Sequence, residues 1–283
     1  MTALSAPAAL VRRLATADLA AVQAMVDAAP FGSAAIAARL DAGRIADVLA
    51  VGEPGAPTAA CYAGGALLPV AGDAATWTVL AGYLGTRRRA CSSIIGAADA
   101  IAVLWPALSS NWGAARRVYP RQPLLALDRP AMVPPDPLVR PARIDELDRY
   151  LPAAVAMFGE ELGIDPLSGP TGKGYRAQLA ALVGARRVLV RTDAYGDVVF
   201  KAELAVVSRH TCQVQGVWVC PDRRGQGIGT AAMAAVVMHG LRLARRELCG
   251  ARKVRSPVQA ARRAQGKPAR TAAEPQGHGA WPD

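Results

Sequence analysis

The sequence predicts an α/β protein of the α+β type, built from two domains in which one arrangement of strands and helices occurs twice. Three observations lead to this prediction: the length, a pattern that recurs after 128 residues, and a proline-dense stretch between the two occurrences. A chain of 283 residues accommodates about two domains of roughly 100–200 residues each. Its hydrophobic content of 52%, against 19% charged residues, excludes a chain that is disordered throughout.

The recurring pattern lies near the start of each half. Residues 10–13 read Leu-Val-Arg-Arg and residues 138–141 read Leu-Val-Arg-Pro, and an acidic residue, Asp18 or Glu146, follows at the same distance. Apolar residues at helical spacing come next in both halves. A second helix is expected at 33–42 and at 175–183, and a short strand at 48–51 and at 188–190. Either the similarity is chance, or one βα-type unit occurs twice.

The two halves are separated by a stretch that excludes regular structure. The twelve residues 130–141 contain five prolines, namely Pro130, Pro134, Pro135, Pro137 and Pro141. Because proline lacks a backbone donor and disrupts helices and central strands, we expect a linker at 131–137. The domains are then expected at 1–130 and 138–250, followed by a basic, disordered tail at 251–283. The first domain shows helical and strand-like runs, including one at 124–127, but no catalytic motif.

Composition excludes several classes of protein. Five scattered cysteines without a CxxC pair exclude a disulfide scaffold and are typical of a reducing compartment, and no metal site is expected. No apolar stretch reaches the ~20 residues of a membrane span. Arg12 and Arg13 come too early for the apolar region of a signal peptide. We therefore expect a cytoplasmic protein without a membrane partner.

The net charge of +11 is unevenly distributed. The tail at 251–283 carries seven basic and two acidic residues, and so supplies +5 of this charge. The remaining +6 is spread over 250 residues, which does not indicate a nucleic-acid-binding surface outside the tail. Binding of nucleic acid by the tail would depend steeply on salt.

The second domain contains the one motif that carries chemistry. Two β-branched runs at 198–207 and 211–219 predict a hairpin, and an apolar helix is expected at 230–243. Between them, residues 221–229 read Pro-Asp-Arg-Arg-Gly-Gln-Gly-Ile-Gly. The glycines permit close approach of the backbone, and the first N–H groups of a helix have no intrahelical partner. This arrangement favours a diphosphate ligand, although a glycine-rich turn without a ligand is the alternative.

The strand end and loop resemble the acetyl-CoA-binding segment of the GCN5-related N-acetyltransferase (GNAT) family. The family signature is Gln or Arg, two residues, Gly, one residue, and Gly or Ala. Arg224, Gly227 and Gly229 match it directly after a strand. The resemblance covers residues 138–245. The sequence before the loop is similar to an actinobacterial branch of the family that has an extra N-terminal domain.

This resemblance implies the GNAT fold, a mixed, mostly antiparallel sheet flanked by helices. Together with the repeat, it implies a tandem in which the first domain is a degenerate GNAT-like copy without a phosphate loop. It also implies an acetyl-CoA-dependent N-acetyltransferase, an acyltransferase whose amine acceptor attacks the thioester directly.

In the family, a β-bulge opens the strand at 214–219 and the pantetheine arm bonds to its main chain, here at Val217 and Val219. The N–H of Val219 is expected to polarise the thioester carbonyl. The residues expected to contact acetyl-CoA are Val217, Trp218, Val219, Arg224, Gly225, Gln226, Gly227, Ile228, Gly229 and Thr230.

The sequence departs from the family at the catalytic base. Many members carry a Glu where this chain has Gln213, which cannot act as a base. Glu203, on the neighbouring strand, is the nearest carboxylate and is the candidate base, with a surface charge as the alternative. We do not expect His210, His239 or Cys220 to be catalytic.

The end of the chain departs further. After the long helix, the family has another strand, a helix with a general-acid Tyr and a closing pair of strands. Residues 251–283 are polar and contain no Tyr, so these strands are expected to be absent. A shifted reading frame or a truncation near Leu248 is one hypothesis for this change. The alternative to an active enzyme is therefore a CoA-binding but inactive relative, and the acceptor and oligomeric state stay open.

Overall fold

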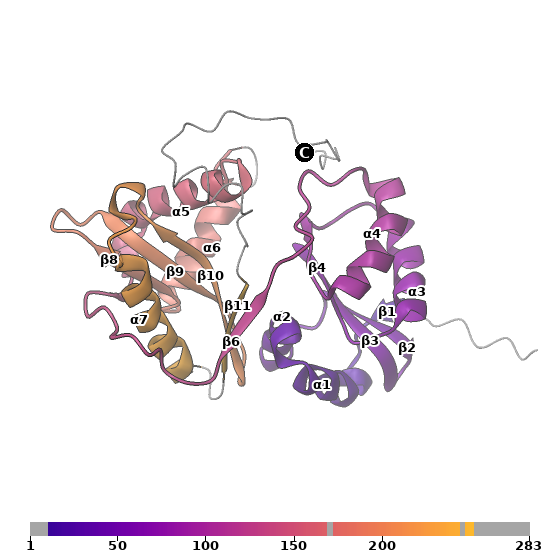
Figure 1. The fold of residues 1–283 in the computed structure, drawn as a ribbon. Helices are drawn as coiled ribbons and strands as arrows, with labels where there is room; N and C mark the ends of the chain where they lie inside the picture. The colour runs from indigo at the N-terminus through magenta and orange to yellow at the C-terminus, as the bar shows by residue number, and fades with distance from the viewer. Residues whose placement is uncertain (1–10, 169–171, 244–246, 252–283) are drawn as a thin grey trace, which may run out of the picture. The chain divides into compact units, whose positions relative to one another are not determined.

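A computed structural model describes residues 11–168, 172–243 and 247–251, which form two compact units divided after Pro123 (Figure 1). The predicted disordered tail lies outside the described residues, apart from Ala251. None of the helices within these described ranges is long and apolar enough to cross a membrane.

The first unit is a five-stranded sheet in the order β1-β2-β3-β4-β5, antiparallel except for the parallel pair β4 and β5. Its strands are β1 (Val11–Arg13), β2 (Val48–Glu53), β3 (Ala56–Ala63), β4 (Ala66–Val70) and β5 (Ser93–Ile94). Its helices are α1 (Leu19–Ala28), α2 (Pro30–Asp41), α3 (Ala74–Gly85) and α4 (Ala98–Trp112). Because side chains alternate along a strand, Val48 and Ala50 pack against α1 and α2, whereas Leu49 and Val51 pack against α3 and α4.

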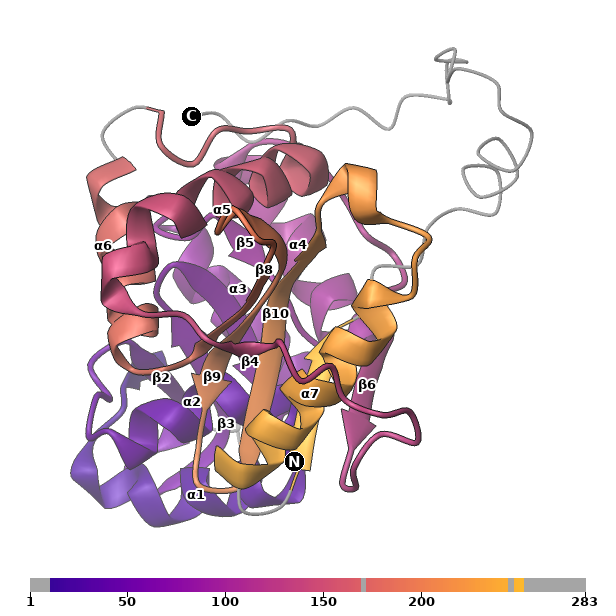
Figure 2. The same ribbon diagram turned by 90° about the vertical axis from the view of Figure 1, so that its left-hand side faces the viewer.

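The second unit has a six-stranded sheet in the order β7-β8-β9-β10-β11-β6. Its strands are β6 (Leu124–Leu127), β7 (Arg140–Pro141), β8 (Val188–Thr192), β9 (Val198–Val207), β10 (Thr211–Val219) and β11 (Glu247–Ala251). Its helices are α5 (Leu147–Leu162), α6 (Gly172–Gly184) and α7 (Ile228–Leu243). Figure 2 shows α7 crossing one face of β9 and β10, where Phe200 and Ala202 pack against it. The opposite face is covered by α5 and α6, and Lys201 and Glu203 point to that side.

The two units repeat one topology. Strands β7 to β11 have the same order and directions as β1 to β5, with the corresponding helices between them. The repeated sequence also makes a repeated contact: Arg12 bonds both carboxylate oxygens of Asp18, at 2.5 and 2.8 Å, and Arg140 bonds both of Glu146, at 2.7 and 2.6 Å. Each pair joins the first strand to the 3₁₀ turn that starts the first helix. The sequence similarity therefore reflects a repeated structure.

Two expectations about strands require correction. The strand at 124–127 was expected in the first domain, but β6 pairs antiparallel with β11 in the second sheet. A strand was expected to be missing after the long helix, but β11 follows α7 and pairs parallel with β10. Its sequence has no β-branched run, and main-chain ladders to β10 on one side and β6 on the other hold it in the sheet. The edge of β10 is thus covered over Thr211–Val214.

Candidate functional site

Strand β10 contains a bulge just beyond Val214, the last of its residues that pairs with β11. Gln215 pairs with Glu203 and Trp218 with Lys201, so two residues of β10 oppose one residue of β9. The bulged Gly216 has φ +59, a conformation that favours glycine. The ladder between β10 and β11 ends at Val214, and no described residue of β11 pairs with β10 beyond that point. Within the described ranges, the main chain of β10 from 215 to 219 therefore has no partner strand on the β11 side.

The glycine loop continues from this open strand end. Gly225 and Gly227 have φ of +80 and +77, and a Cβ added at either would meet no atom within 4 Å. Within the described ranges, no residue accepts a hydrogen bond from the main-chain N–H of Gly225, Gln226 or Gly227. The carbonyl of Gly227 instead accepts from Thr230 and Ala231, which starts α7. Open N–H groups at the N-terminus of a 16-residue helix are able to bind an anion, and whether this loop does so stays a prediction.

Arg224, expected beside the phosphates, is bound within the protein. Its Nη2 donates to both oxygens of Glu160, at 2.9 and 2.7 Å, and its Nε donates to the carbonyl of Val219 at 2.9 Å. Glu160 also accepts from the indole of Trp218 at 3.0 Å. These bonds join the end of β10 to α5, so Arg224 has a structural role that sequence reasoning did not find. Its contact with a phosphate stays a prediction.

Under the bulge lies a buried polar cluster formed by Tyr150, Lys201 and Glu203. Lys201 is fully buried, and its Nζ lies 2.5 Å from Oε1 of Glu203 and 3.1 Å from the hydroxyl of Tyr150. That hydroxyl donates to the same Oε1 at 2.5 Å. Burial lowers the pKa of Lys201, although Glu203 opposes this shift, and burial together with Glu203 raises the pKa of Tyr150 well above its usual range. The phenol therefore stays protonated and acts as a donor.

The cluster contacts the bulge directly. A Cβ added to Gly216 would lie 3.1 Å from Oε1 of Glu203 and 3.2 Å from Nζ of Lys201. The side chain of Glu203 is 12% exposed, and no described residue donates a hydrogen bond to its Oε2. The candidate base thus lies next to the open strand, with one oxygen bound and the other available. Sequence analysis proposed Glu203 but missed its partners Lys201 and Tyr150. The only signal in the sequence was a lysine within the apolar run of β9.

Tyr175, on α6, adds a second phenol to this region. Its hydroxyl oxygen is buried and has no hydrogen-bond partner among the described residues. Its ring packs edge-on against Phe158, with 5.1 Å between ring centroids. Burial and the charge of Glu203 raise the pKa of Tyr175. The hydroxyl is therefore a protonated donor that lacks an acceptor.

The other candidate residues lie outside this arrangement. Gln213 pairs with Val206, on the far side of the bulge from the loop, and His210 lies in the turn between β9 and β10. Cys220 is half-buried at the end of β10. In the described part of the chain, no group of three or more His, Cys, Asp or Glu side chains could hold a metal ion.

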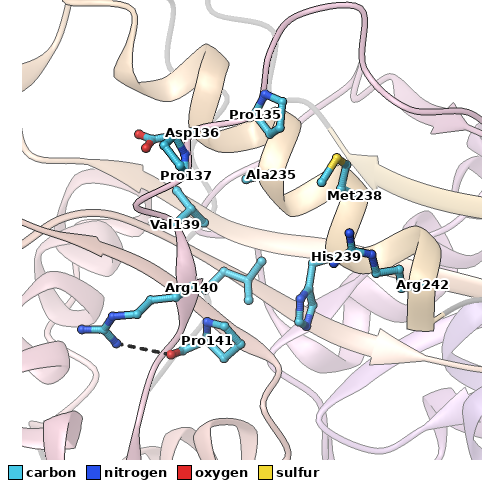
Figure 3. Close-up of a pocket in the computed structure, with 11 residues that line it drawn as sticks. Pro135, Asp136, Pro137, Val139, Arg140, Pro141, Ala235, Met238, His239 and Arg242 are labelled. Carbon is cyan, nitrogen blue, oxygen red and sulfur yellow. Dashed lines mark hydrogen bonds between the residues drawn. The ribbon is translucent and has the colours of Figure 1, made fainter.

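His239 lines a cavity of about 180 Å³ beside the C-terminal half of α7 (Figure 3). Prolines of the predicted linker line this cavity too. The linker is held there by Asp136, which is buried: its N–H donates to the carbonyl of Ala231, and its carboxylate pairs with Arg191 at 2.9 Å. The first unit has a cavity of about 240 Å³ at the same place in the repeat, next to the β1–β2 pairing and the end of α3. Neither cavity is lined by residues of the glycine loop or the bulge, so both are features of the shared packing.

The first unit lacks the features of the candidate site. Strand β4 pairs with β3 without a bulge, and only Ala71, Gly72 and Asp73 connect it to α3. The carboxylate of Asp73 accepts from the N–H of Thr76 at 2.8 Å, which caps α3. A negative charge thus occupies the helix N-terminus where the second unit has open N–H groups, and it would repel a phosphate.

Two family models match different parts of the chain. Residues 176–265 match the model of the acetyltransferase (GNAT) family, and residues 46–150 match a domain of unknown function, DUF4081. No curated protein is a significant match to the chain.

Solved structures match over different lengths. A GCN5-related N-acetyltransferase from Sphaerobacter thermophilus is 13% identical over 92% of both chains, with a TM-score of 0.52. A tandem GNAT protein from the clavulanic acid biosynthesis pathway is 13% identical over 91% of this chain and 94% of its own, with a TM-score of 0.50. A GCN5-related N-acetyltransferase from Kribbella flavida is 18% identical over 43% of this chain, which spans only 27% of that protein, with a TM-score of 0.29. The two long matches share the fold across both units.

Proposed function

We propose that this chain, whose residues 176–265 match the acetyltransferase (GNAT) family model, transfers the acetyl group of acetyl-CoA to an amine by direct attack on the thioester. The observation that carries the proposal is the run of open N–H groups from Gly225 to Gly227, which continues from the open end of β10. A diphosphate fits this loop because both glycines leave space and the helix dipole favours negative charge.

The residues that would hold acetyl-CoA follow from this placement. The main-chain N–H groups from Gly225 to Gly229 would bind the diphosphate, with Thr230 following them in α7, and the open edge at Val217 and Val219 would bind the pantetheine arm. The N–H of Val219 would polarise the carbonyl that the amine attacks. The half-exposed side chain of Val217 supplies apolar surface on the same edge.

On the acceptor side, Glu203 would receive the proton that the attacking amine loses. The nitrogen–carbon bond forms, the carbon–sulfur bond breaks, and the departing thiolate takes up a proton. Oε2 of Glu203 can act in this way because Lys201 and Tyr150 bond only Oε1. They hold the carboxylate beneath Gly216 and act as positioning residues.

The domain assignment belongs to the same proposal. Residues 1–130 would be a degenerate GNAT-like domain, in which Asp73 replaces the phosphate loop, and residues 138–250 would form the acetyl-CoA-binding domain. A CoA-binding protein without turnover is the second candidate. It is favoured by Gln213, which cannot replace the usual carboxylate, and by the ion pair that binds Glu203.

Two measurements on the full chain separate these candidates. Thermal-shift stabilisation by acetyl-CoA tests binding, and thiol release with a panel of primary amines tests turnover. We expect both for the wild type, and for Glu203→Gln we expect binding with strongly reduced turnover. Stabilisation without thiol release from any amine would support the second candidate, and no stabilisation would contradict both.

A further inference from the structure

We propose that the first unit binds a small organic carboxylate whose apolar part is about the size of a benzene ring. The site is the cavity of about 240 Å³ next to the end of α3. This inference is independent of the proposed function, because it gives a binding role to the unit that lacks the glycine loop. It starts from the charged side chains that line the cavity.

Three arginines line this cavity, namely Arg13 of β1 and Arg87 and Arg88, which follow α3. Asp47 is the one acidic side chain of the lining, and within the described ranges neither it nor any of the three arginines forms an ion pair. Three positive charges and one negative charge leave the lining at +2. A cleft lined mainly by charge of one sign concentrates ions of the opposite sign, so this cavity favours an anion.

The corresponding cavity of the second unit is less cationic (Figure 3). Two of its charged side chains pair within the protein, Arg140 with Glu146 and Asp136 with Arg191. Arg242 is the arginine of that lining without an acidic partner among the described residues. The same packing therefore makes both cavities, but three cations without a counter-charge line the first and one lines the second.

Two of the arginines in the first unit are held in place and still have donors to offer. Nη1 of Arg13 donates to the carbonyl of Ala46 at 2.5 Å. Nη1 of Arg87 donates to the carbonyl of Tyr83 at 2.6 Å, and its Cζ lies 3.5 Å from the centroid of that ring. A guanidinium has five N–H donors, and a carboxylate can accept two of them in parallel. Because these side chains are already ordered, binding an anion costs less conformational entropy.

The buried part of the lining is apolar. Leu49, Leu67, Leu84 and Trp112 all belong to the hydrophobic core of the unit. An apolar cavity of about 150 Å³ is large enough to bind benzene, so this one accommodates a similar group together with a carboxylate. An inorganic anion would leave the apolar wall in contact with water, and an uncharged apolar molecule would leave the arginines unpaired. The two features together indicate an anion with an apolar body.

Titration of the full chain with phenylacetate tests the proposal. Acetate lacks the ring, phenylacetamide lacks the charge, and phenyl phosphate replaces the carboxylate. We expect phenylacetate to bind about tenfold or more tightly than each of the three, measured by calorimetry. No binding of phenylacetate, or equal affinity for acetate or phenylacetamide, would overturn the inference. Equal or tighter binding of phenyl phosphate would contradict the carboxylate class.

A pair of arginine variants locates the site. Arg88 is exposed and bonds no described residue, so Arg88→Gln removes a charge from the lining without removing an internal contact. We expect it to weaken phenylacetate by about tenfold. Arg121→Gln is the matched control, because Arg121 is an exposed arginine of the same unit that also bonds no described residue and does not line the cavity. Equal loss in both variants, or no loss in Arg88→Gln, would overturn the inference.

Acetyl-CoA keeps this inference separate from the proposed function. Saturating acetyl-CoA should not displace phenylacetate, and Arg88→Gln should be stabilised by acetyl-CoA as much as the wild type. Displacement of phenylacetate by acetyl-CoA would place both ligands in one site and overturn the inference. A chain that binds phenylacetate but not acetyl-CoA would contradict the proposed function alone.

Discussion

The ammonium nitrogen of Lys201 lies 2.5 Å from Oε1 of Glu203, two residues further along β9, and is fully buried. Alternation along the strand puts both side chains on the face that α5 and α6 cover. A lysine without access to water persists there only because the carboxylate and Tyr150 bond it. The same bonds hold the carboxylate beneath Gly216, so the stability of this unit and the geometry of its candidate base depend on one pair.

Replacing Lys201 should therefore destabilise the protein. Lys201→Met leaves Glu203 without its buried counter-charge, and we expect the free energy of unfolding to fall by about 3–5 kcal/mol. Lys201→Met combined with Glu203→Gln should recover part of this loss, because no unpaired charge remains. Denaturant unfolding measures both, with Lys173→Met, at an exposed position on α6, as the control. A Lys201→Met protein as stable as the control would contradict the role of the pair.

Asp18 should make stability depend on pH. Its hydrogen bonds with Arg12 lower the pKa of this buried carboxyl well below its ordinary value near 4, although desolvation opposes the shift. Because the pKa is lower in the folded state, Asp18 stabilises the protein above about pH 4, and this contribution is lost as the pH falls toward the folded pKa.

Asp18→Asn should consequently lower the free energy of unfolding by about 1–3 kcal/mol at pH 7 and reduce its decline between about pH 4 and pH 2. Unfolding at several pH values measures this. Asp128→Asn, whose ion pair with Arg129 is exposed, serves as the control and should change neither quantity. An Asp18→Asn protein that declines as steeply as the wild type would refute the assignment.

Gly227→Asp should weaken the binding of acetyl-CoA. The substitution puts a carboxylate among the open N–H groups at the start of α7, and we expect the affinity to fall by about tenfold or more, since about 1.4 kcal/mol corresponds to each factor of ten. Calorimetric titration measures the affinity. Gly43→Asp is a matched control: Gly43 has φ +64 and, like Gly227, no atom within 4 Å of an added Cβ, but it lies in the first unit. Equal affinity in both variants would remove the loop from the proposed site.

Gly216→Ala should impair turnover more than binding of the diphosphate. The new methyl group would press on Glu203 and Lys201 at 3.1–3.2 Å, in a backbone conformation that L-residues rarely adopt. We expect kcat to fall by about tenfold or more, through displacement of the carboxylate. Gly163→Ala controls for backbone strain, because Gly163 has φ +69 and open space. If both variants lose kcat equally, the contact between bulge and cluster has no catalytic role.

Local features of the fold were predictable from the sequence because they depend on residues close together in the chain. The hairpin at 198–207 and 211–219 matches β9 and β10, since β-branched residues and a short polar turn act locally. The glycine loop was found because its conformation depends on its own residues. The Arg12–Asp18 and Arg140–Glu146 pairs were visible as a repeat because each spans only six residues.

Other features required the tertiary structure. Tyr150 lies on a helix, and Lys201 and Glu203 lie on a strand, so the packing of α5 against β9 decides that these three residues meet. The strand-like run at 124–127 was predicted, but its pairing with β11 was not, because main-chain hydrogen bonds between distant segments leave no pattern in the sequence. The amino-acid sequence by itself determined where an anion could bind the backbone, because that site is one turn and the start of one helix. Only the tertiary structure decided which side chains gather beneath the bulge of β10, because burial and hydrogen bonding between distant segments are properties of the packed chain.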